Sequence, residues 1–145
     1  MSIWKTEKSI DELQLFATNT LIDHLGIKIT EIGSDYISAS MPVDCRTHQP
    51  MGLLHGGASV VLAETLGSVA AQLAAEPGHS CVGLEINANH LSGISTGTVY
   101  GTASPVHIGR STQVWDIRIV DEKGKAICIS RLTVAVLGKS PDLGK

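Results

Sequence analysis

The sequence predicts an α+β fold in which an antiparallel sheet wraps around one long central helix. Residues 53–73 form a helix-length, mainly apolar stretch that carries a single acid, Glu64. Two alternating segments precede this stretch, and four segments rich in Val, Ile and Thr follow it. Strand segments on both sides of one long helix suit an antiparallel sheet packed on that helix.

The N-terminal part is predicted to hold a short helix and a strand hairpin. Ser9 and Glu12 match a capping box, so a helix is expected to begin there, followed by a short turn that ends at Gly26. Residues 27–31 and 36–41 alternate between polar and apolar, and a Gly-Ser-Asp turn separates them. They therefore predict two paired strands.

The central helix and the later strands follow from similar signals. A loop over residues 42–52 leads into the helix, which is expected from about His55 to Ala75. Glu76-Pro77-Gly78 then ends it. The four remaining strands are expected at residues 81–90, 97–107, 111–120 and 126–137.

Length and composition indicate one domain. With 145 residues, 43% hydrophobic residues and a net charge of −3, the chain is long enough to bury a core. We expect residues 1–138 to form this domain and residues 139–145 to form a loose C-terminal tail. The basic residues are scattered, which argues against binding to nucleic acid.

Several patterns indicate a cytoplasmic protein. Cys45, Cys81 and Cys128 are odd in number and lack CxxC spacing, which argues against a disulfide framework and a zinc site. The N-terminus lacks the apolar segment of a secretory signal. Residues 53–73 are long enough to span a bilayer, but Glu64 in their middle disfavours a membrane segment.

Glu64 is the strongest candidate for a catalytic group. A helix that is apolar around most of its circumference is expected to be buried, and burial of an unpaired carboxylate costs free energy. Such a group often has a functional role. The alternative is a carboxylate that only pairs with a lysine or with the backbone.

The same helix predicts a dimer. A sheet shields the helix on one side, so a second copy is expected to cover the other side. His55 and Glu64 lie nine positions apart, about 13.5 Å along the helix and on roughly opposite sides, so they cannot meet on one substrate within one chain. Antiparallel packing of two helices would bring His55 of one chain beside Glu64 of the other. We therefore expect composite sites, two per dimer.

The helix start is suited to hold a carbonyl oxygen. Free backbone N–H groups at His55-Gly56-Gly57 and the positive end of the helix dipole favour an oxygen that becomes negative during a reaction. The alternative is that these glycines only allow tight packing. Ser68 shares the face of Glu64, and Gln49 can donate an amide N–H, although packing and loop roles are open for both. The sequence lacks serine-hydrolase, metalloprotease and nucleotide-binding motifs.

The motifs at residues 49–59 and 62–68 resemble the hotdog-fold acyl-CoA thioesterases of the phenylacetate-degradation type. Within that group the chain is most similar to the 1,4-dihydroxy-2-naphthoyl-CoA thioesterases of menaquinone synthesis and to the enterobactin proofreading thioesterases. The likeness extends from about residue 3 to residue 137 and includes residues 82–90 and 121–124.

The resemblance implies a hotdog fold, dimers that pair into a homotetramer, and thioester hydrolysis without a metal or cofactor. Glu64 corresponds to the catalytic carboxylate, which acts as nucleophile or as the base that activates water. Gly56 corresponds to the backbone donor that polarises the thioester carbonyl, and His55 and Gln49 assist it. Ser68 corresponds to a residue near the attacking water or the carboxylate.

In the relatives, three segments hold CoA, and Arg110 is the expected phosphate partner in this chain. The corresponding residues here are Gly83, His90, Leu91, Ser92, Gly93, His107, Ile108, Gly109, Arg110, Ser111 and Thr112. Relatives carry Arg directly after the position of His90, where this chain has Leu91. This difference puts a phosphate contact there in doubt, and the aromatic content of 3% leaves the acyl specificity open.

The implied function is hydrolysis of an aromatic hydroxyacyl-CoA, such as 1,4-dihydroxy-2-naphthoyl-CoA in menaquinone biosynthesis, to the acid and free CoA. Two alternatives stay open. One is a proofreading thioesterase that removes misloaded aryl groups from an acyl or aryl carrier protein. The other is a non-catalytic acyl-CoA-binding module of the same fold.

Overall fold

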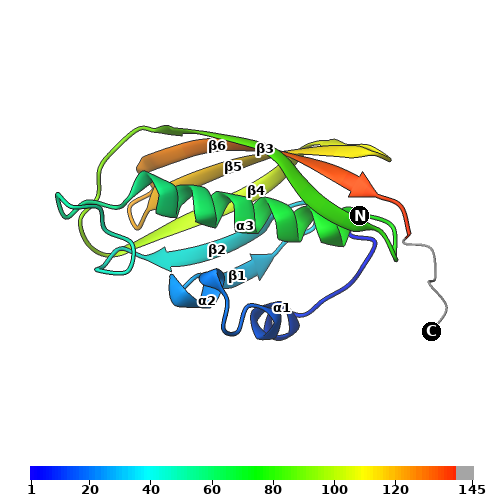
Figure 1. Ribbon diagram of the computed structural model, residues 1–145, viewed down its shortest axis with the longest axis horizontal. Coiled ribbons are helices and arrows are strands. Elements are labelled where there is room, and N and C mark those ends of the chain that lie inside the picture. Colours follow the sequence, from blue (N-terminus) through cyan, green and yellow to red (C-terminus); the bar gives the residue numbers. More distant parts are fainter. Residues whose placement is uncertain (140–145) are drawn as a thin grey trace.

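Six antiparallel strands curve around one long helix (Figure 1). The computed structural model describes residues 1–139. The predicted tail, residues 139–145, therefore lies outside the described residues except for Lys139. The strands follow the order β1-β2-β4-β5-β6-β3, so β1 and β3 form the two edges of the sheet.

The predicted strands are all present, and their ends differ from the prediction by at most one residue. The central helix is α3 (Gly56–Ala74), and two short helices precede the sheet, α1 (Ile10–Phe16) and α2 (Leu21–His24). The Ser9–Glu12 capping box is confirmed, because each side chain accepts a hydrogen bond from the backbone N–H of the other residue. The strands are β1 (Lys28–Ile32), β2 (Ile37–Pro42), β3 (Ser80–His90), β4 (Thr98–Ile108), β5 (Thr112–Asp121) and β6 (Ala126–Leu137).

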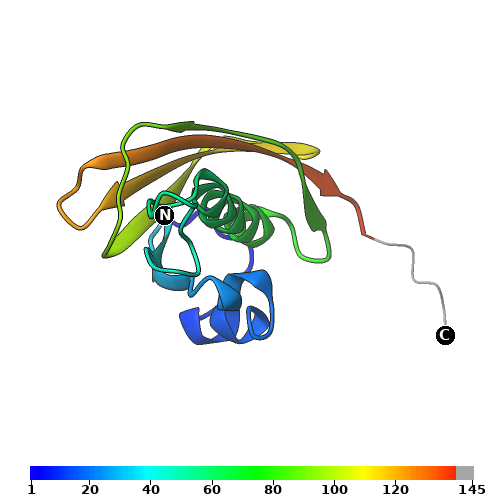
Figure 2. The ribbon, with the colours of Figure 1, turned by 60° about the vertical axis from the view of Figure 1, so that its left-hand side comes forward.

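The core lies between α3 and the concave face of the sheet. Figure 2 shows α3 beneath the curved sheet, with α1 and α2 on the other side of α3. Leu62 and Leu66 of α3 and Trp115 and Ile117 of β5 are fully buried there. Glycine allows α3 to approach β4 closely, because a Cβ atom on Gly101 would lie 2.7 Å from Leu66 Cδ1.

Leu66→Ala is expected to lower the free energy of unfolding by about 2–5 kcal/mol, because it leaves a cavity at the contact between α3 and the sheet. Urea denaturation followed by circular dichroism measures this change. Leu15→Ala is the control, since Leu15 is 74% exposed on α1 and its loss should cost less than about 0.5 kcal/mol. Equal effects of the two substitutions would contradict the assignment of Leu66 to the core.

The prediction that Glu64 is buried is wrong for the single chain. Its side chain is exposed, because the sheet covers only one side of α3. The apolar residues on the other side, Val61 and Val69, are half-buried and lie with Ile22 of α2 around the same pocket. The sequence showed apolar residues around most of the circumference of α3. In the structure, short helices rather than an enclosing core cover part of this apolar surface.

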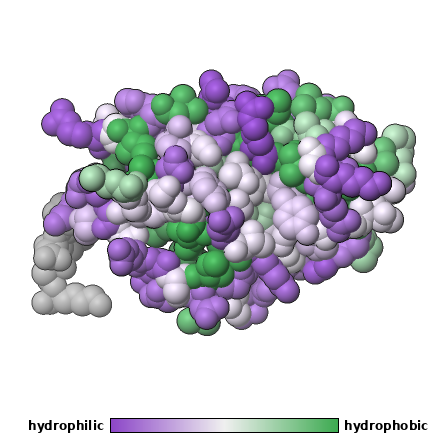
Figure 3. Space-filling view, turned by 180° about the vertical axis from the view of Figure 1, so that it is seen from behind, coloured by the Kyte–Doolittle hydropathy of each residue, from purple (hydrophilic) through white to green (hydrophobic). Residues whose placement is uncertain are grey.

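The helix α3 is also long and apolar enough to span a membrane by length and composition alone, the single such helix in residues 1–139. However, 56% of its apolar window is buried inside the protein, as expected of a core helix. The side of the molecule opposite to the view of Figure 1 is mainly hydrophilic or intermediate, and its apolar residues form small separate groups (Figure 3).

Candidate active site

The start of α3 leaves one backbone donor free. His55 is the N-cap, and its Nδ1 accepts a hydrogen bond of 2.8 Å from the Gly57 N–H. The N–H groups of Ala58 and Ser59 both donate to the His55 carbonyl oxygen. Among the described residues, the Gly56 N–H has no acceptor. Gly56 is thus the free amide in the first turn, where the helix dipole favours negative charge.

The same hydrogen bond fixes the form of the His55 ring. Because Nδ1 accepts from the Gly57 N–H, Nδ1 carries no proton, and in a neutral ring the proton resides on Nε2. His55 can therefore donate a second hydrogen bond, from Nε2, next to the free amide of Gly56.

The loop before α3 is held by its own polar groups. Thr47 is buried, its hydroxyl donates to the Pro42 carbonyl oxygen, and its carbonyl oxygen accepts from the His55 N–H at 2.8 Å. Arg46 donates to Asp44 at 2.7 Å, and these hydrogen bonds lower the pKa of the Asp44 carboxyl to about 2. These contacts fix the chain that carries Gln49.

Gln49 lies at the rim of a pocket of about 310 Å³ at the start of α3. Its Oε1 accepts from the Met51 N–H, which leaves its side-chain NH₂ group without a partner in the described part of the chain. The pocket walls include Gly56 and His90 together with Leu91, Ser92 and Gly93. The structure therefore brings together two of the predicted carbonyl-binding residues, Gln49 and Gly56, and the predicted CoA-binding segment of residues 90–93.

His90 lies directly over Gly56. A Cβ atom added to Gly56 would come within 2.7 Å of His90 Nε2, so the absence of a side chain at position 56 allows the imidazole to sit there. The sequence predicted free backbone N–H groups or tight packing at this glycine, but it gave no sign that His90 lies against it. The contact arises because β3 ends beside the start of α3.

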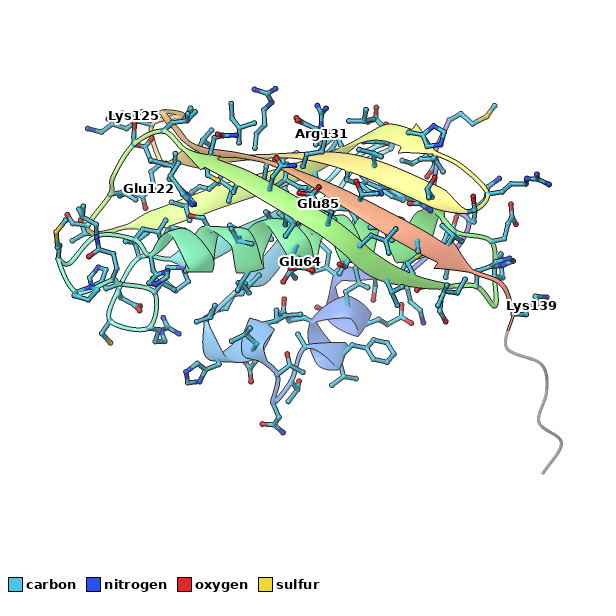
Figure 4. The ribbon with its side chains drawn as sticks, turned by 45° about the horizontal axis from the view of Figure 1, so that its top comes forward. Glu64, Glu85, Glu122, Lys125, Arg131 and Lys139 are labelled. Atoms are coloured by element: carbon cyan, nitrogen blue, oxygen red, sulfur yellow. The ribbon has the colours of Figure 1, made fainter. Side chains whose placement is uncertain are left out.

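Glu64 and Ser68 lie in a different pocket, of about 320 Å³, between α2 and α3. Figure 4 shows Glu64 on α3, below the edge strand β3. A Cβ atom on Gly83 of β3 would lie 3.1 Å from Glu64 Oε1. Within residues 1–139 the carboxylate has no hydrogen-bond or ion-pair partner, so the alternative of a carboxylate that only pairs inside its own chain finds no support.

One protomer does not unite the two halves of the predicted site. The pocket at Gly56 and the pocket at Glu64 share no lining residue. The two residues are eight positions apart on one straight helix, which corresponds to about 12 Å of rise.

The last predicted CoA-binding segment, residues 107–112, lies near the other end of α3. Ile108, Gly109 and Arg110 line a cavity of about 350 Å³ together with residues 74–76 at the end of the helix. That end is about 27 Å from Gly56. Sequence reasoning missed Lys5 and His79, which line the same cavity beside Arg110, because they come from distant parts of the chain.

The described residues contain no group of three or more His, Cys, Asp or Glu side chains placed to hold a metal ion. Cys45, Cys81 and Cys128 are free thiols. Burial raises the pKa of the Cys81 and Cys128 thiols.

Comparison with known proteins defines the class. Residues 51–128, which include Gly56 and Glu64, match the family model of the Thioesterase superfamily. The chain belongs to this superfamily and has the hotdog fold, and it is a thioester hydrolase. The predicted fold and class of enzyme are confirmed.

Individual relatives support this assignment along nearly the whole chain. The proofreading thioesterase EntH of Cronobacter turicensis is 51% identical over 136 residues, which cover 94% of this chain and 99% of that protein. The crystal structure of thioesterase HI1161 from Haemophilus influenzae superposes with a TM-score of 0.94 at 46% identity and covers 98% and 99% of the two chains. A mutant of thioesterase PA1618 from Pseudomonas aeruginosa gives a TM-score of 0.92 at 50% identity, with coverages of 94% and 99%.

Proposed function

We propose that this protein hydrolyses an aromatic hydroxyacyl-CoA, such as 1,4-dihydroxy-2-naphthoyl-CoA of menaquinone biosynthesis, to the acid and free CoA. It acts in the cytoplasm, without a cofactor, at sites that two chains form together. The observation that supports this most directly is a pair of groups on α3 that have no hydrogen-bond partner within residues 1–139, the Glu64 carboxylate and the Gly56 N–H.

The edge strand β3 supports the dimer. β3 has eleven residues and pairs with β6 on one side only. Val82 and Leu84 on this strand are 45% and 62% exposed. Long apolar edges in soluble proteins are usually paired or protected. Antiparallel pairing of β3 with β3 of a second copy would cover this edge and continue the sheet.

This pairing would also unite the half-sites. Gly83 of β3 lies beside Glu64, and His90 of β3 lies beside Gly56. Gly83 and His90 are seven positions apart on β3, about 24 Å. A two-fold axis between residues 86 and 87 would place Gly83 of one chain opposite His90 of the other chain. Each dimer then has two sites, and two such dimers form the homotetramer that the resemblance implies.

The chemistry at such a site follows from its groups. The Glu64 carboxylate takes a proton from water while the water oxygen attacks the thioester carbonyl carbon. The carbonyl oxygen becomes negative and accepts a hydrogen bond from the Gly56 N–H, with His55 Nε2 and Gln49 as further donors. The C–S bond then breaks, and the CoA thiolate takes the proton from Glu64. In the nucleophilic route the Glu64 carboxylate attacks the carbonyl carbon, the C–S bond breaks and CoA leaves as the thiolate. Water then hydrolyses the resulting anhydride to the free acid and the Glu64 carboxylate, and the proton that water releases neutralises the thiolate.

The remaining polar residues complete the proposal. Ser68 lies one turn beyond Glu64 on the same face, from where it would orient the attacking water. Arg110 would pair with a CoA phosphate, and Lys5 adds a second positive charge to the same cavity.

The similarity to proofreading thioesterases favours a second candidate, removal of misloaded aryl groups from a carrier protein. Release of free thiol from 1,4-dihydroxy-2-naphthoyl-CoA and from aryl carrier protein loaded with the same acyl group separates the two. We expect kcat/KM to be at least about tenfold higher with the CoA thioester, a difference of about 1.4 kcal/mol in transition-state stabilisation. A preference for the loaded carrier protein would support the proofreading function instead. Binding of CoA by calorimetry without thiol release from either substrate would identify a binding module.

A further inference from the structure

The segment that carries Gln49 forms a small hairpin just before α3. His48 and Leu54 pair in an isolated antiparallel bridge, and Gly52 in the turn has a φ of +76°. Met51 at the tip is 79% exposed. We call residues 47–55 the Gln49 hairpin. A two-stranded hairpin is only marginally stable by itself, so its orientation depends on contacts outside it.

In the described part of the chain, Gln49 makes its own hydrogen bonds within this hairpin. Its N–H donates to the Leu53 carbonyl oxygen at 2.8 Å, and its carbonyl oxygen accepts from the Gly52 N–H at 2.9 Å. Its side-chain Oε1 accepts from the Met51 N–H. These bonds shape the turn but do not fix it relative to Gly56. The position of the Gln49 NH₂ group therefore depends on how the hairpin as a whole is held.

Residues 91–97, the loop between β3 and β4, hold the Gln49 hairpin at the end of the molecule where α3 begins (Figure 1). On the arm that leads into α3, the Leu54 N–H donates to the Ile94 carbonyl oxygen at 2.7 Å. On the other arm, His48 Nε2 lies 2.8 Å from the Ser95 carbonyl oxygen. A carbonyl oxygen only accepts, so His48 Nε2 is the donor. Among the described residues, this is the one side-chain hydrogen bond between the hairpin and the loop.

The loop is itself attached to the sheet at both ends. The Leu91 N–H donates to the carbonyl oxygen of Ile127 on β6, and the Gly97 carbonyl oxygen accepts from the Val43 N–H, both at 2.8 Å. Loss of the His48 bond would therefore loosen the hairpin and leave the predicted CoA-binding segment in place.

We propose that His48 is a positioning residue for the thioester hydrolysis, because its bond to Ser95 holds the Gln49 NH₂ group against the carbonyl oxygen bound at Gly56. This proposal rests on the proposed function, in which Gln49 donates to that oxygen. His48 does not line the pocket at Gly56, so it acts through its neighbour. A group near the reacting atoms that moves by about 1 Å can cost about 10²-fold in rate, so a side chain that only holds the hairpin can change kcat.

His48→Ala is expected to lower kcat by about three- to tenfold, because Gln49 then meets the carbonyl oxygen in only a fraction of the molecules. KM should change by less than about twofold, since Gly56 and the CoA-binding segment keep their positions. The measurement is thiol release from 1,4-dihydroxy-2-naphthoyl-CoA, or from aryl carrier protein loaded with the same acyl group if that reacts faster.

Two further histidine variants serve as controls. His48→Gln should recover most of the lost kcat, because the glutamine Nε2 reaches about as far as the histidine Nε2 and still donates. His24→Ala should leave kcat unchanged, since His24 is an exposed histidine on α2 that lines neither pocket of the candidate site. A His48→Gln variant as slow as His48→Ala would contradict a role for the donated hydrogen bond.

A double variant shows whether His48 acts through Gln49. Gln49→Ala alone should lower kcat by at least about tenfold. Addition of His48→Ala to Gln49→Ala should lower kcat by less than about a further twofold, because the group that His48 positions is already absent. If the two losses multiply instead, His48 does not act through Gln49.

Hydrogen exchange tests the attachment of the hairpin without an activity measurement. His48→Ala should speed exchange of the Gln49 and Gly52 N–H groups by at least about threefold, while Leu66 in the core exchanges as in the parental protein. A loss of kcat without faster exchange in the hairpin would overturn the proposal.

The failure of this inference differs from the failure of the proposed function. A parental protein that hydrolyses a thioester, together with an unchanged kcat in His48→Ala, would overturn the role of His48 alone. A parental protein that hydrolyses neither the CoA thioester nor the loaded carrier protein would overturn the proposed function and this role with it.

Discussion

Glu64→Gln is expected to lower kcat by about 10²–10⁴-fold while CoA binding is retained, because the amide keeps the size of the side chain but neither accepts the proton nor attacks the carbonyl. Glu64 is exposed and has no partner in the described part of its own chain, so the substitution should change the free energy of unfolding by less than about 0.5 kcal/mol. Thiol release at several substrate concentrations gives kcat and KM, and calorimetry gives the affinity for CoA.

Glu122→Gln is the matched control for this experiment. Glu122, labelled in Figure 4, is an exposed carboxylate in the turn between β5 and β6, and it lines neither pocket of the candidate site. Its replacement makes the same change of charge and should leave kcat unchanged. A Glu64→Gln variant that works at the parental rate would remove Glu64 from the mechanism.

Mixing two inactive variants is expected to restore about a quarter of the parental activity. Gly56→Val should be inactive, because its side chain collides with His90 and covers the free amide. When this variant is unfolded and refolded with Glu64→Gln, half of the dimers should contain one chain of each kind. In each mixed dimer one of the two sites has both an intact Glu64 and an intact Gly56, which gives about one quarter of all sites.

The control for the mixing experiment is a pair of variants that damage the same half-site. Glu64→Gln mixed with Glu64→Ala should show no recovery, because every site then lacks the carboxylate. Native mass spectrometry shows whether mixed dimers have formed. If they form with Gly56→Val and activity does not return, each site is built within one chain.

The strands were predictable to within one residue because alternation of polar and apolar residues reports directly which face of a strand is buried. The position of Glu64 on a helix was predictable for a similar reason. The exposure of Glu64 could not be predicted. Apolar residues around a helix indicate that other parts of the protein can cover it, but they do not indicate which elements do so. Here α1 and α2 take part of that role.

Contacts between segments that are far apart in the sequence could not be predicted from its patterns. His90 reaches Gly56 because β3 pairs with β6 in one particular register and ends beside the start of α3. Lys5 joins Arg110 because the N-terminal segment bonds to the end of α3, where its N–H donates to the Leu73 carbonyl oxygen. Periodicity within a segment contains no information on either arrangement.

The helix α3 also fixes the geometry between two functional groups. It carries the free amide of Gly56 and the carboxylate of Glu64 on one rigid rod, so the number of residues between them sets both the spacing and the relative direction of the two groups. Removal of a single residue from positions 57–63 would turn Glu64 by about 100° and shift it by about 1.5 Å. Evolution can therefore exchange the side chains in this segment but has little freedom to change its length.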